Sequence, residues 1–82
     1  MGAVGKYDRF SDWLAEHQTG SVECSFLALD DLAGGLPRSA RSHRAWWAND
    51  RRHVQAQAWL DAGFHVENVN LSAGRVVFLR GT

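Results

Sequence analysis

The chain has 82 residues, 45% of them hydrophobic, and its nine basic and nine acidic side chains cancel to a formal net charge of zero. A chain this short forms one domain with a compact core, and its single cysteine, Cys24, excludes an intramolecular disulfide and a cysteine zinc cluster. No apolar run approaches the roughly 20 residues of a membrane helix, and we expect no secretory signal, because residues 1–5 are short and no apolar stretch follows them. We expect a flexible leader over residues 1–6 and a single α+β domain over 7–82, cytoplasmic, without membrane contact, metal or cofactor.

The first predicted elements are a helix and a strand. Aromatic and apolar residues recur at helical spacing from Tyr7 to His17. Asp8 is a suitable N-cap for this helix, and Gly20 can end it in a left-handed conformation. Residues 21–26 then alternate between apolar and polar side chains, which is typical of a half-buried strand.

Three further helices are predicted before the C-terminal region. Ser25 is a suitable N-cap for the first of them, and two consecutive glycines stop it. Pro37 fixes the entry to the next helix, and Ser39 can cap it. A break at Asn49–Asp50 precedes the last helix, which Gly63 ends. The expected ranges are 25–33, 39–47 and 51–62.

The C-terminal residues predict a β-hairpin. The apolar positions of 64–71 change phase by one residue, which indicates a bulge near Glu67–Asn68. A short loop, in which Gly74 can adopt a positive φ, leads to a strand over 75–80. The expected fold is α+β and winged-helix-like: an N-terminal helix, a short strand, two to three helices, and a C-terminal hairpin that forms a three-stranded antiparallel sheet with the first strand. The expected core is Phe10, Trp13, Leu14, Val22, Cys24, Phe26, Leu29, Leu32, Trp47, Trp59, Phe64, Val66, Val76 and Phe78.

Several short motifs along almost the whole chain resemble a small bacterial domain family of unknown function. The most specific of them are the LPxSAR and WWAN segments, which begin at Leu36 and Trp46. The resemblance implies a free-standing or fused cytoplasmic domain and implies no activity. Position 9, often proline in that family, is Arg9 here. The other matching segments are Lys6-Tyr7-Asp8, Ser25-Phe26, Gln57-Ala58-Trp59, Ala62-Gly63-Phe64 with Val66, and Val76 with Phe78.

The segment 36–53 is the main candidate for function, because it is both basic and aromatic. It holds five of the eight arginines and two of the four tryptophans, with Asp50 as its one acidic residue. Arg38, Arg41 and Arg44 are spaced by three, so a helix would carry them as a stripe able to follow a phosphate backbone or pair with guanine. The alternative is a solvated face that pairs with the acidic N-terminal helix.

Trp46 and Trp47 cannot both face the core from one helix, because neighbouring side chains diverge by about 100°. We expect one of them in the core, more specifically Trp47, and the other half exposed. The exposed one would cover a neighbouring helix or stack on a base, and structural use of both is the favoured interpretation. Asn49 is expected to cap the next helix or form a turn, with a contact to adenine as the alternative.

The four histidines show no spacing of a helical metal site, so a zinc centre is not expected. A nuclease is conceivable with His43 and His53 as general base and acid and Arg44 as the phosphate clamp. Such chemistry usually also needs a carboxylate cluster for a metal ion, and the basic segment offers only Asp50.

We therefore predict a non-catalytic domain that binds duplex DNA. The alternative is a protein-interaction or regulatory module, such as an accessory subunit or a phage-type inhibitor, which would use the same surface and is favoured by the neutral total charge. A small nuclease is the third hypothesis. A continuous positive face would favour nucleic acid, whereas arginines held in internal ion pairs would argue against it. The predicted contact residues are Arg38, Arg41, Ser42, Arg44, Trp46, Asn49, Arg51, Arg52 and Arg75.

Overall fold

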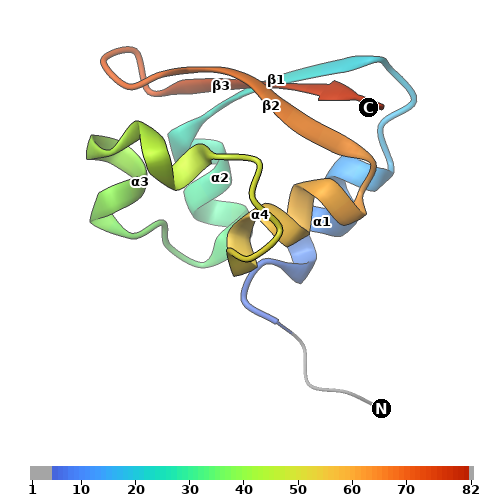
Figure 1. The fold of residues 1–82 in the computed structure, drawn as a ribbon, viewed down its shortest axis with the longest axis horizontal. Coiled ribbons are helices and arrows are strands. Elements are labelled where there is room, and N and C mark those ends of the chain that lie inside the picture. Colours follow the sequence, from blue (N-terminus) through green and yellow to red (C-terminus); the bar gives the residue numbers. More distant parts are fainter. Residues whose placement is uncertain (1–4, 82) are drawn as a thin grey trace.

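The computed structural model describes residues 5–81 and shows a three-stranded antiparallel sheet with every helix on one of its faces (Figure 1). The strands are β1 (Ser21–Ser25), β2 (Phe64–Asn70) and β3 (Arg75–Arg80), in the order β1-β3-β2. The first strand therefore pairs with the C-terminal hairpin. This confirms the predicted α+β class and its antiparallel sheet.

The inner face of the sheet follows from the alternation of apolar residues. Phe78 of β3 lies opposite Val22 of β1 and Val66 of β2. The register of β2 against β3 shifts between Val66 and Asn68, which confirms the predicted bulge. Because the bulge adds one residue to β2, the buried positions change phase and the apolar side chains after it still face the helices.

Five helical segments cover that face: α1 (Asp8–Ala15), α2 (Phe26–Ala33), α3 (Arg38–Ser42), the 3-10 helix η1 (Arg44–Trp47) and α4 (Val54–Asp61). The Ser25 side chain accepts a hydrogen bond from the Ala28 amide at 3.1 Å, which confirms Ser25 as the N-cap of α2. Gly34 ends α2 with a φ of 70°, a conformation that favours glycine.

The predicted ends of α1 were wrong. Tyr7 is the N-cap residue, and the Asp8 carboxylate instead accepts a hydrogen bond from the Gly5 amide at 2.8 Å. The helix stops at Ala15, before it reaches Gly20. Of the predicted leader, residues 1–4 lie outside the described residues, while the Lys6 ammonium donates to the Ala33 carbonyl at 3.1 Å.

The predicted helix over 39–47 is two shorter segments, since His43 is extended with φ −126° and ψ 112°. Pro37, and not Ser39, occupies the N-cap position of α3. The last helix begins three residues later than expected because the Asp50 carboxylate accepts the Arg52 amide at 3.0 Å and closes a separate turn before it.

The core lies between the sheet and the helices and is rich in aromatic side chains. Trp59 has 1% of its surface exposed, and its ring contacts the rings of Trp47 and Phe78. Phe78 in turn contacts the ring of Phe10. All predicted core residues are buried except Trp13, Leu32 and Val66, which pack against the core while partly exposed. Within the described part of the chain no helix is long and apolar enough to cross a membrane.

Candidate nucleic-acid interface

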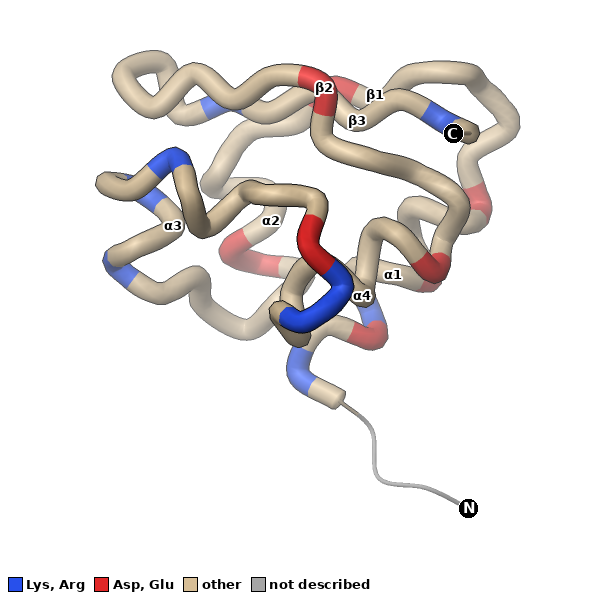
Figure 2. Tube along the Cα trace, in the orientation of Figure 1, with Lys and Arg blue, Asp and Glu red and all other residues tan. Residues whose placement is uncertain are grey.

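Three of the predicted contact arginines lie together on α3 and at the start of η1. Ala40, at the centre of α3, is fully buried, so this short helix turns Arg38 and Arg41 outward. Figure 2 shows the basic positions of α3 at the end of the molecule that also carries the β2–β3 loop, with a further basic position at the start of β3. We call this surface, made by Arg38, Arg41, Arg44 and Arg75, the basic end.

The Trp47 side chain anchors α3 to the core. Its indole N–H donates to the Ala40 carbonyl at 2.7 Å, in the buried interior. Arg44 is fixed from the other side, since one of its guanidinium nitrogens donates to the Val69 carbonyl on β2. That contact orients Arg44 and leaves its positive charge without a carboxylate partner among residues 5–81.

Ser42 is exposed at the end of α3. Its hydroxyl donates to the Arg38 carbonyl at 3.1 Å and lies 2.9 Å from Nδ1 of His43. The hydroxyl therefore already has local partners, but it remains at the surface beside Arg41.

Two arginines of the basic end face carboxylates from other elements. Arg41 lies 3.2 Å from Asp30 of α2, and Arg75 lies 3.1 Å from Glu23 of β1. All four side chains are 38–56% exposed, so both pairs are in contact with water. Exposed ion pairs contribute little to stability, because solvent screens them and two long side chains must be ordered.

Asp30 has a second role in the fold. Its Oδ1 accepts the Leu36 amide at 2.6 Å, which joins the end of α2 to the entry of α3. This backbone hydrogen bond, together with Arg41, holds the pKa of Asp30 below its ordinary value. Asp30 is therefore a fixed anion next to Arg41.

Arg51 and Arg52 lie in the turn before α4, and this turn is apart from the basic end (Figure 2). Arg51 pairs with Asp61 at 2.7 Å, and Arg52 pairs with Asp50 at 2.7 Å. The hydrogen bonds from Arg52 lower the pKa of Asp50, so this pair persists into acid. The basic segment of the sequence therefore folds into two sites, and the second is neutralised by its own carboxylates.

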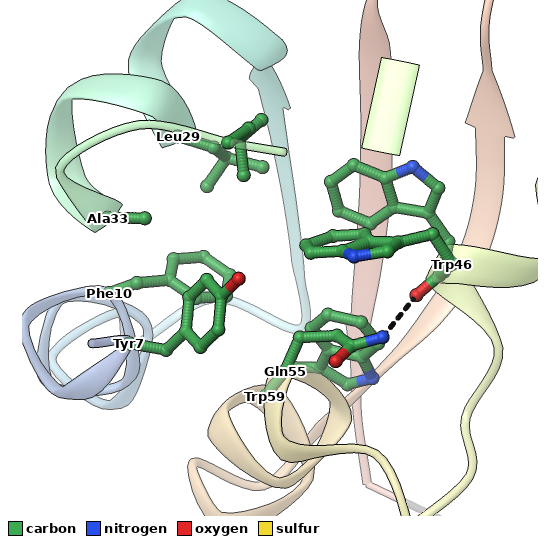
Figure 3. Close-up of a pocket in the computed structure, with 9 residues that line it drawn as sticks. Tyr7, Phe10, Leu29, Ala33, Trp46, Gln55 and Trp59 are labelled. Atoms are coloured by element: carbon green, nitrogen blue, oxygen red, sulfur yellow. Dashed lines mark hydrogen bonds between the residues drawn. The ribbon is translucent and has the colours of Figure 1, made fainter. Parts of the chain in front are cut away.

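Trp46 belongs to the aromatic core and not to the basic end. Its ring packs edge-on against Trp47, with centroids 4.6 Å apart, and also contacts Tyr7 and Trp59. Its backbone carbonyl accepts a hydrogen bond from the side-chain Nε2 of Gln55 at 3.1 Å (Figure 3). The void between these side chains measures about 10 Å³, the space of one water molecule, so it holds no ligand as it stands.

Asn49 acts as a partner for the edge of β2, a role that sequence reasoning missed. Its amide nitrogen donates to the Val66 carbonyl at 3.0 Å, and its Oδ1 accepts the Val66 amide at 2.8 Å. The same Oδ1 accepts the Trp59 indole N–H at 2.9 Å. A single side chain thus replaces the next strand of the sheet at Val66. An Asn after two tryptophans suggests a capping role, and only the fold reveals this one.

The side chains considered for a nuclease are not joined by hydrogen bonds in the described part of the chain. Among residues 5–81, no cluster of three or more His, Cys, Asp or Glu could hold a metal ion. No hydrogen bond within the same range joins His43 to His53. Burial raises the pKa of Cys24 to about 12, which keeps this thiol protonated and unreactive at neutral pH.

Comparison with known proteins identifies only a family. No curated protein and no solved structure matches the chain. The family model described as a domain of unknown function, DUF7662, matches residues 7–81 and so covers almost the entire described structure. This agrees with the resemblance to an uncharacterised small domain that the sequence motifs indicated. The chain therefore belongs to the family of the domain of unknown function DUF7662.

Proposed function

We propose that the chain is a non-catalytic domain that binds duplex DNA through the basic end. The observation that carries this proposal is the exposure of Arg38, Arg41 and Arg44 on one short segment, at the end of the molecule where β3 begins with Arg75 (Figure 2). Arginine guanidinium groups pair well with phosphate oxygens and with the guanine edge. A duplex is favoured over a single strand because Trp47 is buried and the partly exposed Trp46 packs its ring against Trp47, so neither offers an open stacking surface beside these arginines.

The four arginines have different parts in this proposal. Arg38 and Arg44 face no carboxylate among the described residues and would contact phosphates first, with Ser42 as a neighbouring polar group. Arg41 and Arg75 would have to leave their carboxylate partners. Two to four neutralised phosphates correspond to a salt slope, d log K/d log[salt], of roughly −2 to −4.

The proposed contact surface is smaller than the one expected from the sequence. Asn49 and Trp46 are excluded from it because their polar groups and rings already bind within the fold. Arg51 and Arg52 are excluded because they lie apart and are paired. The likeness to a winged helix-turn-helix concerns only the order of elements, since α3 has five residues and is too short to lie along a major groove as a reading helix. A bacterial, cytoplasmic setting fits this proposal.

The proposal is tested by titrating a labelled duplex with the protein between about 50 and about 200 mM salt. We expect weak, micromolar binding at the lower salt concentration. Arg38→Gln and Arg44→Gln should each reduce the salt slope by about one. Arg9→Gln is the matched control, because Arg9 is an exposed arginine on α1 and carries the same charge change. Absence of binding at low salt, or an equal effect of the Arg9 variant, would reject the proposal.

A protein-interaction module is the second candidate. It is favoured by the pairing of Arg41, Arg51, Arg52 and Arg75 with carboxylates, which lowers the net positive charge available to a polyanion. In that case the basic end would contact an acidic protein surface, as in an accessory subunit or a phage-type inhibitor. Absence of duplex binding by the wild-type protein at low salt would favour this candidate.

A further inference from the structure

The basic end contains its own anions, and these come from elements other than α3. Asp30 reaches Arg41 from α2, and Glu23 reaches Arg75 from β1. Asp30 is held there by the Leu36 amide at 2.6 Å, which fixes the carboxylate beside the Arg41 guanidinium. Each of these carboxylate oxygens makes with its arginine the same kind of charge-assisted contact that a phosphate oxygen makes.

We propose that Asp30 and Glu23 are intramolecular competitors of the phosphate backbone and set the affinity of the basic end low. This inference rests on the proposed function. A phosphate that binds Arg41 must displace or share the carboxylate, and it also meets the repulsion of a fixed negative charge. Arg38 and Arg44 face no such competitor among residues 5–81, so they form the part of the surface that is always available.

The consequence is a domain whose affinity for DNA is held low by its own carboxylates. With both competitors in place, about two arginines release counterions, and with both removed, about four do so. A chain with no net charge therefore keeps a basic surface that binds duplex DNA weakly on its own.

The test uses substitutions that remove charge and preserve shape. Asp30→Asn keeps Oδ1 as the acceptor for the Leu36 amide, and Glu23→Gln retains the length of the side chain. Each should raise duplex affinity about two- to five-fold at low salt and steepen the salt slope by up to about one. The double variant should bind about ten-fold more tightly.

Asp31→Asn is the matched control, because Asp31 is exposed on the same helix, one residue from Asp30, and makes no ion pair within the described residues. It carries the same change in net charge without removing a competitor. An effect of Asp31→Asn equal to that of Asp30→Asn would overturn the inference, since the gain would then come from net charge alone.

The inference and the proposed function fail in different ways. Duplex binding that depends on Arg38 but is unchanged by Asp30→Asn and Glu23→Gln overturns the inference and leaves the function standing. Wild-type binding that is strengthened in the double variant, and abolished in both by Arg38→Gln, supports both. Absence of binding in the wild type and in all of these variants at low salt overturns both.

Discussion

Replacement of Asn49 by alanine tests whether this residue serves the fold or the ligand. The substitution removes two hydrogen bonds to the Val66 backbone and one from the Trp59 indole. Trp59 is 1% exposed, so its N–H would lose its partner in a buried site, at about 1–3 kcal/mol. Water can partly replace Asn49 at the edge of β2, so the two backbone bonds add only about 1 kcal/mol.

We therefore expect Asn49→Ala to lower the free energy of unfolding by about 2–4 kcal/mol. That is a large part of the total for a domain of this size, and it lowers Tm by roughly 10–25 °C. Thermal and urea unfolding, followed by circular dichroism and tryptophan fluorescence, measure the change. Asn49→Asp keeps both acceptor contacts, but it replaces the donor to Val66 by a carboxylate oxygen that faces the Val66 carbonyl, so the lost bond and this repulsion together should cost about half as much.

The control for Asn49 is Asn68→Ala. Asn68 is exposed next to the β2 bulge and should change stability by no more than about 0.5 kcal/mol. Equal stability of the Asn49 and Asn68 variants would refute the structural role of Asn49. If Asn49→Ala also kept the wild-type Tm while it weakened DNA binding, the base-contact alternative would be correct.

Three further predictions concern the aromatic core, the basic end and the thiol. Trp59→Ala and Trp47→Ala should each destabilise the domain by about 3–5 kcal/mol, and Trp46→Ala by less. Acrylamide should quench Trp46 more than the other two, and equal shielding of all three rings would contradict this. Arg41→Ala should leave Tm nearly unchanged because its ion pair is exposed, and a large loss of stability would show that Arg41 is a structural residue. Arg44→Ala should lower the free energy of unfolding by about 1 kcal/mol, because the Val69 carbonyl loses its hydrogen-bond donor. The Cys24 pKa is raised from 9.0 to about 12, so the unfolded chain loses this proton at a lower pH than the folded one. The free energy of unfolding should therefore fall as the pH rises from about 9 to about 12. Unfolding curves of Cys24→Ala should show a smaller fall over this range.

Elements with local signals were predictable from the sequence. Ser25 before an apolar run and Gly34 after it identify the two ends of α2, because both act through hydrogen bonds or φ values within a few residues. The β2 bulge was equally visible, since the phase of the apolar residues changes within one strand. Pairing of the first strand with the hairpin followed from the order of the elements.

The break at His43 could not be predicted, because its cause is packing between distant segments. The spacing of Ala40, Arg44 and Trp47 suits a continuous helix, yet the structure turns at His43. The turn lets Trp47 stack on Phe26 at 5.3 Å and on Trp59 at 5.9 Å while its neighbour Trp46 also reaches the core. A straight helix would have sent one of the two rings into solvent.

The candidate site was predictable in composition and not in arrangement. A cluster of arginines in the sequence indicates a basic surface, but it does not show which carboxylates lie opposite. Glu23 and Arg75 are 52 residues apart in the chain and meet only because β1 pairs with β3. The same limit explains Asn49, whose partner strand lies 17 residues further on.

The location of the duplex on the protein is the most direct test of the proposed function. Amide chemical-shift perturbation of the isotope-labelled protein, titrated with a short duplex at low salt, reports the contact surface residue by residue. We predict that the largest shifts fall in α3, at Arg44 and at the start of β3 near Arg75, with small shifts at Arg51 and Arg52. Shifts centred on Arg51 and Arg52, or no shifts at all at low salt, would contradict the assignment of the basic end as the DNA-binding surface.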